Sequence, residues 1–389
     1  MSAGARKDPY LLTPGPLTTS PETKQALLRD LGARDRPFIE MCARIRARLT
    51  EIAGAADGHD CVLVQGSGTF AVEAAVGTLV PRTGKLMVLA NGTYGQRIAK
   101  IAQAIGRAFT VIETPEDAPL ATGQVDRALA ADPKISHVAA VHLETSSGLM
   151  NPIEDIAATV ARHGRRLLID AMSTFGGIEL DARVLPFEAI IASANKCLEG
   201  VPGAAFVIAR REALAEAAGN APSLSLDLHD QWRYMAETGQ FRFTPPTHVL
   251  AALDRALEEH AAEGGVRARG ARYRRNREVL VEGMRALGFE TYLEDALLSP
   301  IIVAFHMPGD PRFDFTTFYQ ALSRRGFVIY PGKLAQAETF RIGCIGRIGE
   351  REIRAALAAV AEAVEELGIE ERGRRSSATR PRRTPRCPA

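Results

Sequence analysis

Two ionisable residues stand at the ends of consecutive apolar segments, and their types can do chemistry together. Asp170 closes the segment 166–170, and Lys196 follows the segment 189–193 by three residues. An acid that ends an apolar strand is poorly solvated and needs a cationic partner. In such surroundings the charged ammonium form of a lysine is energetically unfavourable, which lowers its pKa. The uncharged amine that results can react with carbonyl groups. Taken alone, Asp170 would be interpreted as a helix cap or a metal ligand. Taken alone, Lys196 would be interpreted as an ordinary surface lysine.

Two turns add groups that could bind a ligand. The turn 65–69 reads Gln-Gly-Ser-Gly-Thr. Its glycines permit a tight bend, the helix that follows offers free N–H groups to an anion, and the Ser67 and Thr69 hydroxyls could add donors. Tyr94, in Asn-Gly-Thr-Tyr-Gly, could stack on a flat ligand. The plainer alternatives are a glycine turn and a packing tyrosine.

In combination these groups predict a site for pyridoxal phosphate. A phosphate cradle, a stacking ring, an acid and a lysine at neighbouring strand ends are what this cofactor needs. Asp170 would pair with the ring nitrogen and keep it protonated, so that the ring withdraws electrons. Lys196 would bind the cofactor aldehyde covalently and later carry a proton to and from the substrate carbon.

The elements that must position these residues alternate along the chain. We predict strands at 61–64, 85–90, 137–142, 166–170, 189–193 and 204–209, with helices at 69–80, 95–105 and 153–162 between them. Strands that are apolar on both faces and interleaved with helices indicate an α/β fold with a mostly parallel sheet covered on two sides. Ligands of such sheets bind beyond the carboxyl ends of the strands, where the reactive residues fall.

After Pro245-Pro246 the pattern changes and predicts a smaller α+β domain. Its predicted helices cover 250–263, 266–287, 315–324 and 350–367, and its strands cover 301–305, 328–330 and 339–342. We place the large cofactor-binding domain at residues 16–256 and the small domain at residues 1–15 and 257–371. Residues 372–389 mix Arg, Ser, Thr and Pro with almost nothing apolar and are predicted to be a disordered tail.

Composition excludes several classes of protein. The tail holds seven of the arginines, and the other 41 basic residues face 46 acidic ones, a net charge of −5. An acidic body opposes nucleic-acid binding. The chain has no apolar run of about 18 residues, and its first ten lack the apolar stretch of a secretory signal, so we expect no membrane association and a cytoplasmic location. The five cysteines show no metal-binding spacing, so no metal is expected.

From residue 10 to 367 the chain resembles the class V aminotransferases. The motifs that carry the resemblance are LTPGP (12–16), GSGT (66–69), NGTYG (91–95), HLETSSG (142–148), Asp170, SANK (193–196) and RIG (341–343). Within that class it is most similar to the 2-aminoethylphosphonate–pyruvate transaminases, through the stretches 11–20, 170–177, 193–203, 223–228, 241–248 and 326–333. The resemblance implies fold type I of the pyridoxal-phosphate enzymes.

The resemblance also implies roles for individual residues. Lys196 corresponds to the lysine that binds the cofactor, and Asp170 to the partner of its ring nitrogen. The other cofactor-binding residues implied are Ser67, Gly68, Thr69, Tyr94, Thr145, Ser193 and Thr244. Thr244 is similar to a residue that reaches the phosphate of the neighbouring subunit, which implies a homodimer with shared sites. The substrate-binding residues implied are Arg341, Gly15 and Arg34, and the Arg341 guanidinium suits an anionic group.

The implied activity is transfer of the amino group of 2-aminoethylphosphonate to pyruvate, which gives phosphonoacetaldehyde and L-alanine in phosphonate catabolism. Three alternatives stay open. One is another class V transaminase, such as a serine or alanine–glyoxylate aminotransferase. Another is a pyridoxal-phosphate lyase, although a desulfurase-type lyase needs a mobile cysteine and Cys344 lies beside a strand pattern. The last is a nucleic-acid binder that uses the arginine-rich tail.

Overall fold

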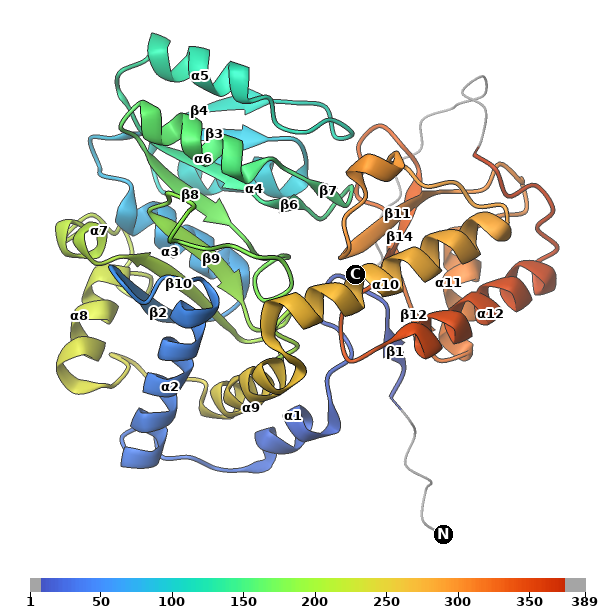
Figure 1. Cartoon of the computed structure of the whole chain (residues 1–389), viewed down its shortest axis with the longest axis horizontal. Coiled ribbons are helices and arrows are strands. Elements are labelled where there is room, and N and C mark those ends of the chain that lie inside the picture. The colour runs from blue at the N-terminus through green and yellow to red at the C-terminus, as the bar shows by residue number, and fades with distance from the viewer. Residues whose placement is uncertain (1–7, 375–389) are drawn as a thin grey trace.

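A computed structural model describes residues 8–374, and a seven-stranded sheet is its largest element (Figure 1). The strands lie in the order β2 (His59–Gln65), β10 (Ala204–Arg210), β9 (Ala189–Ser193), β8 (Arg166–Asp170), β5 (Ile135–Val141), β3 (Lys85–Ala90) and β4 (Ala108–Glu113). Only β10 is antiparallel to its neighbours; every other pair is parallel. The sequence therefore predicted the class of sheet correctly.

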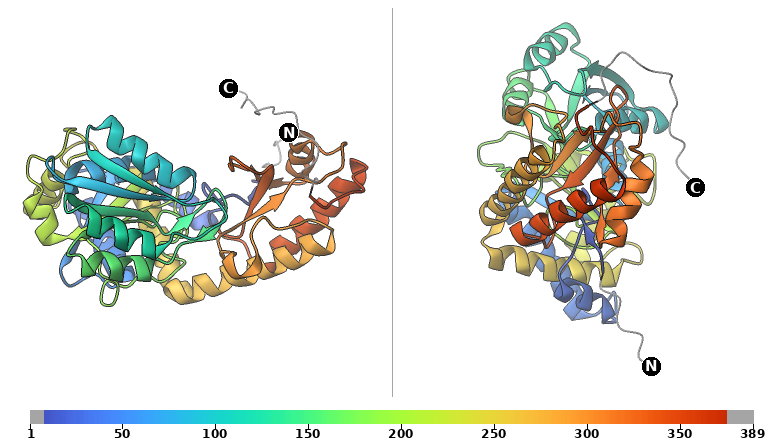
Figure 2. Two further views of the ribbon diagram at one scale, coloured as in Figure 1. Left: turned by 90° about the horizontal axis from the view of Figure 1, so that it is seen from above. Right: turned by 90° about the vertical axis from the view of Figure 1, so that its right-hand side faces the viewer.

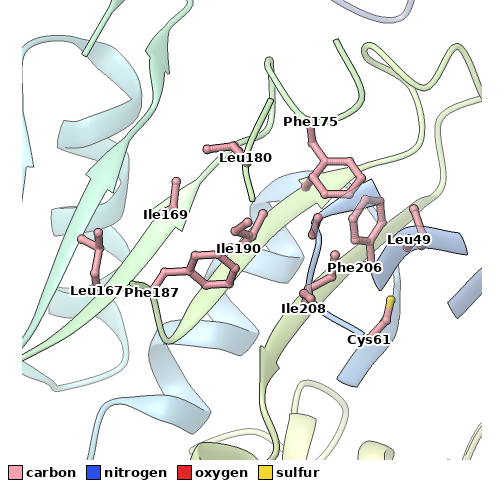
Figure 3. Packing of buried hydrophobic residues seen from close by; sticks show 14 of the residues in the cluster. Leu49, Cys61, Leu167, Ile169, Phe175, Leu180, Phe187, Ile190, Phe206 and Ile208 are labelled. Atoms are coloured by element: carbon pink, nitrogen blue, oxygen red, sulfur yellow. The ribbon is translucent and has the colours of Figure 1, made fainter. Parts of the chain in front are cut away.

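Helices cover both faces of this sheet because its strands are apolar on both sides. One face packs against α3 (Gly68–Leu79), α4 (Thr93–Ala104), α7 (Arg211–Glu216) and α8 (Leu228–Thr238). The other packs against α2 (Arg36–Ile52), α5 (Thr122–Ala131), α6 (Ile153–Arg162) and α9 (Thr247–Glu263). Along β8 the side chains alternate, so Leu167 and Ile169 join the second cluster (Figure 3) while Leu168 joins the first.

A smaller antiparallel sheet forms a second body. Its order is β11 (Ile302–His306), β14 (Thr339–Gly343) and β13 (Tyr330–Pro331), and it packs with α10 (Gly265–Ala286), α11 (Phe315–Arg324) and α12 (Glu350–Glu366). Figure 2 shows α10 running from the large body to the small one. The N-terminal strand β1 (Tyr10–Leu11) pairs with β12 (Phe327–Val328) in the small body. The predicted limits of the two domains stay a prediction.

Five short elements complete the described chain: α1 (Pro21–Gln25), the 3-10 turns η1 (Ala26–Leu28) and η2 (Asp295–Leu297), and the paired strands β6 (Leu143–Glu144) and β7 (Leu149–Met150). The strands β3, β8 and β9 and the helices α6 and α11 have the predicted bounds. The single strand predicted at 328–330 was wrong. The chain there switches from parallel pairing with β1 to antiparallel pairing with β14, and buried Ile329 separates the two short strands.

The described residues include the first three of the predicted tail, Arg372 to Arg374. Arg372 donates from Nη1 to the Leu287 carbonyl at 3.2 Å, and the Arg374 amide donates to Glu290 at 3.3 Å. The rest of the predicted tail, residues 375–389, lies outside the described residues, as do residues 1–7. Between residues 8 and 374, no helix is long and apolar enough to cross a membrane, and no group of three or more His, Cys, Asp or Glu side chains could hold a metal ion.

Candidate active site

Asp170 and Lys196 meet at the carboxyl edge of the large sheet. Strands β8 and β9 run parallel with Asp170 opposite Ile191, so both strands end at the same edge of the sheet and β9 continues two residues farther. Lys196 follows the end of β9 by three residues. Both side chains line one cavity of about 190 Å³, together with the turn at the start of α3 and with Tyr94. The structure thus brings together the acid and the lysine that were predicted from the strand ends.

Burial makes the Lys196 amine easier to deprotonate. Loss of solvent lowers the pKa of Lys196 to about 8, and the positive charges of Arg341 and Lys333 act in the same direction. Cys197 and Asp170 oppose this shift. At pH 7 about a tenth of the amine is therefore uncharged and able to attack an aldehyde or accept a proton, far more than for an exposed lysine.

Asp170 is a buried carboxyl group that favours a cationic partner. It is 6% exposed, and burial raises its pKa to about 6, with Glu144 contributing in the same direction. The Met172 amide donates to its Oδ1 at 3.0 Å and lowers the pKa, as do Lys196 and Arg97. A protonated ring nitrogen would supply the cation that this carboxylate needs.

The turn before α3 has the groups of a phosphate cradle. Ser67 is the N-cap residue of α3, yet its side chain makes no capping hydrogen bond. Gly68 lies so close to Met172 that an added β-carbon would stand 2.3 Å from the sulfur. Arg97 donates from Nη1 to Thr69 Oγ1 at 3.3 Å and lines the same cavity. Two hydroxyls, a helix N-terminus and a guanidinium suit a phosphate group.

Arg97 was missed at the level of sequence. It stands three residues after Tyr94 on α4, a spacing that puts both side chains on one face of a helix. Its guanidinium lies 4.8 Å from the centroid of the Tyr94 ring. The position of Tyr94 itself is fixed by buried Glu144, whose Oε2 accepts a hydrogen bond from the Tyr94 amide at 3.1 Å. The signal that could have found Arg97 is this helical spacing.

Thr145 and Ser193 are both buried, and only Ser193 is among the residues that line the cavity. The Thr145 hydroxyl shares a hydrogen bond of 2.6 Å with Ser173, and its carbonyl accepts a hydrogen bond from Arg341. Ser193 lines the cavity and donates to Asn195 Oδ1 at 3.0 Å. Thr145 therefore connects the cofactor side of the site to the predicted substrate arginine.

Arg341 reaches the site from β14 of the small body. Its side chain is 1% exposed, and it donates from Nη1 to the Thr145 carbonyl at 2.9 Å and from Nε to the Pro331 carbonyl at 3.1 Å. Two anchors hold the planar group in one orientation, which suits recognition of a carboxylate or phosphonate by a pair of hydrogen bonds.

The remaining predicted residues divide into one that lies at Lys196 and two that do not. Gly15 lies directly against the Lys196 side chain. Arg34, in the loop before α2, and Thr244, in the segment before α9, are both exposed. Neither is among the residues of this chain that line the cavity. The predicted roles of these two residues therefore stay predictions.

The donor set fits pyridoxal phosphate. Lys196 and Asp170 match the aldehyde and the ring nitrogen, the turn at Ser67, Gly68 and Thr69 matches the phosphate, and the Tyr94 ring matches a flat heterocycle. When bound, this cofactor supplies the electron withdrawal that makes a hydrogen on an amino-bearing carbon acidic. The acid, the amine, the cradle and the ring were all predicted from the sequence, and here they surround one cavity.

Comparison with known proteins defines the class. The family model for class V aminotransferases matches residues 22–333. The chain therefore belongs to the class V aminotransferases, a family dependent on pyridoxal phosphate. More narrowly, the chain is 56% identical over 362 residues to a 2-aminoethylphosphonate–pyruvate transaminase from Pseudomonas fluorescens, a match that covers 93% of this chain and 98% of that protein. It groups with this transaminase family, as the resemblance predicted.

Solved structures share the same fold. Pyridoxamine–pyruvate aminotransferase from Mesorhizobium loti superposes with a TM-score of 0.85 at 27% identity, covering 94% of this chain and 95% of the other. Alanine–glyoxylate aminotransferase from a Nostoc species has a TM-score of 0.85 at 22% identity, covering 94% and 97%. The second likeness concerns the fold alone. Because proteins named for different substrates share this fold, it does not identify the substrate.

Proposed function

We propose that this protein transfers the amino group of 2-aminoethylphosphonate to pyruvate, producing phosphonoacetaldehyde and L-alanine. The observation that carries the proposal is the placement of Arg341, a buried and doubly anchored guanidinium whose charge acts on Lys196. It puts an anion-binding group near the amine that would serve the reaction. The high identity to transaminases named for these substrates supports the same assignment.

In this proposal each residue has a defined task. Lys196, in its uncharged form, takes a proton from the amino-bearing carbon of the substrate and holds it at Nζ for return. Asp170, as a carboxylate, holds the charge of the cofactor ring in place. Arg341 grips the phosphonate in one half of the cycle and the carboxylate of pyruvate in the other, since both present paired oxygens to its N–H groups.

The decisive experiment supplies the purified protein with cofactor, 2-aminoethylphosphonate and pyruvate and measures L-alanine and phosphonoacetaldehyde together. Both products should appear in equal amounts, and neither should form when either substrate is omitted. Serine or alanine with glyoxylate tests the alternative class V activities, and faster turnover of those pairs would overturn the proposal. Product release without any keto acid would indicate a lyase instead.

The proposed active form is a homodimer whose subunits share their sites. Thr244 is exposed and is not among the residues of its own chain that line the cavity, and beside it Phe243 is 50% exposed. Phe70, directly after the phosphate cradle, is 51% exposed. Large exposed aromatic side chains mark surfaces that another protein covers. A second copy that covers both aromatic residues could bring the partner subunit's Thr244 to the phosphate cradle.

A mixing experiment tests sharing directly. Lys196→Ala and Thr244→Glu should each inactivate the protein, the first by removing the amine and the second by placing a negative charge at the phosphate of the partner subunit. In a mixed dimer one site would receive both defects and the other neither, so activity should return when the variants are refolded together. If activity stays absent while native mass spectrometry of the two variants, one of them carrying a mass tag, confirms mixed dimers, Thr244 does not act across an interface.

A further inference from the structure

Three cationic side chains converge on Tyr94. The Arg97 guanidinium lies 4.8 Å and the Lys333 amine 5.8 Å from the centroid of its ring. The Arg341 guanidinium interacts electrostatically with the Tyr94 side chain. Arg341 has a predicted role at the substrate, whereas Lys333 has none. Since Lys333 and Arg341 both act electrostatically on Lys196, both charges belong to the surroundings of the reactive amine.

The two arginines are oriented by contacts that give them separate tasks. Arg97 donates to Thr69 Oγ1 and is therefore directed to the phosphate cradle. Arg341 is fixed by the carbonyls of Thr145 and Pro331, which leave its outer edge for a substrate anion. These contacts explain the positions of the two arginines, but they do not explain the function of the third positive charge, that of Lys333.

Lys333 lies on the same hairpin as Arg341, the one that β13 and β14 form. Pro331 of β13 accepts the Arg341 hydrogen bond, and the next residue, Gly332, donates from its amide to the Thr339 carbonyl at 2.8 Å. A β-carbon at Gly332 would stand 2.3 Å from that carbonyl oxygen, so the backbone approach is close and fixed. Lys333 follows at once and is exposed. The hairpin thus carries a buried arginine and, nearer the surface, an exposed lysine.

The two proposed amino donors differ in ways that match this arrangement. In alanine the carboxylate is bonded directly to the amino-bearing carbon, whereas in 2-aminoethylphosphonate a methylene group stands between that carbon and phosphorus. The phosphonate therefore lies farther from Lys196 than the carboxylate does. It also has three oxygens and, once fully ionised, two negative charges, for which one guanidinium is an incomplete counter-charge.

We infer that Lys333 is a specificity-determining residue that binds the phosphonate group of 2-aminoethylphosphonate together with Arg341, whereas Arg341 binds the carboxylate of alanine and pyruvate without Lys333. This inference rests on the proposed function, because it assigns the discrimination between its two anionic substrates. A hydrated lysine on a flexible stem suits the outer position, since it can contact the larger anion without closing the site to the smaller one.

The test uses non-reactive analogues that lack the amine. Ethylphosphonate represents 2-aminoethylphosphonate, and propionate represents alanine. Calorimetry on the cofactor-loaded enzyme should show that Lys333→Met weakens ethylphosphonate binding about tenfold, the loss of one charge-assisted hydrogen bond, while propionate binding changes by less than about twofold. Lys333→Arg keeps the charge and should bind both analogues much like the parent. Lys134→Met, an exposed lysine elsewhere, controls for net charge.

Kinetics should show the same division. Lys333→Met should raise the KM for 2-aminoethylphosphonate about tenfold and leave the KM for pyruvate near that of the parent. Equal losses for both anions, or no loss for either, would overturn the assignment of Lys333. If the parent protein itself neither transaminates 2-aminoethylphosphonate nor binds ethylphosphonate, the proposed function fails instead. Equal melting temperatures of parent and variants exclude misfolding, as expected for an exposed side chain.

Discussion

Gly15 lies against the side chain of Lys196 so closely that a β-carbon at Gly15 would stand 2.6 Å from Lys196 Cδ. The same β-carbon would stand 2.6 Å from the Asn195 carbonyl oxygen, and the Gly15 backbone has a φ of +119°. The N-terminal segment therefore lies against the Lys196 side chain and limits the space available to it. Only glycine satisfies both the backbone conformation and the available space.

The first prediction concerns this contact between Gly15 and Lys196. Gly15→Ala should displace the Lys196 side chain and lower kcat/KM by about a hundredfold, since misplacement of a reactive group by about 1 Å has effects of that order. Gly58→Ala is the matched control: Gly58 also has a positive φ, +93°, but no atom lies within 4 Å of an added β-carbon. Similar activity losses in the two variants would show that strain alone, not contact with Lys196, is responsible.

The second prediction separates stability from activity. Burial lowers the pKa of Lys196 from 10.5 to about 8. The charged form of this lysine therefore lowers the free energy of unfolding of the apoprotein. That destabilisation is fully present below pH 8 and disappears as pH rises toward 10.5. Lys196→Met should abolish activity yet stabilise the apoprotein at neutral pH by on the order of 1–3 kcal/mol. Urea unfolding measures the gain, and exposed Lys100→Met should show none. A destabilised Met variant would contradict this account.

The third prediction concerns the reactivity of the same amine. Cyanate carbamoylates uncharged amines, so the rate at Lys196 in the apoprotein should rise with pH through a midpoint near 8. Exposed lysines in the same sample should follow a midpoint near their ordinary pKa and serve as internal controls. Peptide mass spectrometry reports each site separately. Asp170→Asn removes a charge that raises the Lys196 pKa, so the midpoint should move to lower pH.

The fourth prediction concerns Asp170. Asp170→Asn keeps the side-chain shape and an oxygen for the Met172 amide but removes the charge. Activity should fall by about a hundredfold to a thousandfold, as for other lost electrostatic contacts at reacting groups. Cofactor binding, followed by absorbance after dialysis, should largely remain because the phosphate cradle is intact. Asp132→Asn, which breaks a partly exposed ion pair with Lys85, controls for loss of an acid. Full activity of Asp170→Asn would exclude the proposed role.

The fifth prediction concerns Arg341. Arg341→Lys retains the charge but cannot hold both the Thr145 and Pro331 carbonyls while presenting a paired contact to substrate. The KM should rise about tenfold to a hundredfold for both 2-aminoethylphosphonate and pyruvate. This common effect contrasts with the selective effect expected at Lys333. Arg285→Lys, in an exposed pair with Asp295, should leave both KM values unchanged.

Local sequence was sufficient to predict much of the sheet and the residues at its edge. The apolar segments that became β3, β8 and β9 read as strands because both of their faces are buried, and such segments have few alternatives. The edge strand β4 was not predicted, because its side chains are only partly buried and its pattern is weak. Asp170 and Lys196 were identifiable because the first is a charged residue that ends an apolar strand and the second follows the next apolar strand by three residues.

Sequence alone determined most strands of the large sheet and which groups stand at their ends. Only the tertiary structure decided how segments distant along the chain surround the reactive amine. The approach of Gly15, the meeting of Lys333 and Tyr94, and the buried anchors of Arg341 depend on how the small body packs against the large one. That packing joins residues hundreds of positions apart, and no local periodicity records such contacts. A short-range pattern is fixed by the pleat and the helical turn, whereas a shared cavity is fixed by the summed packing of the whole chain.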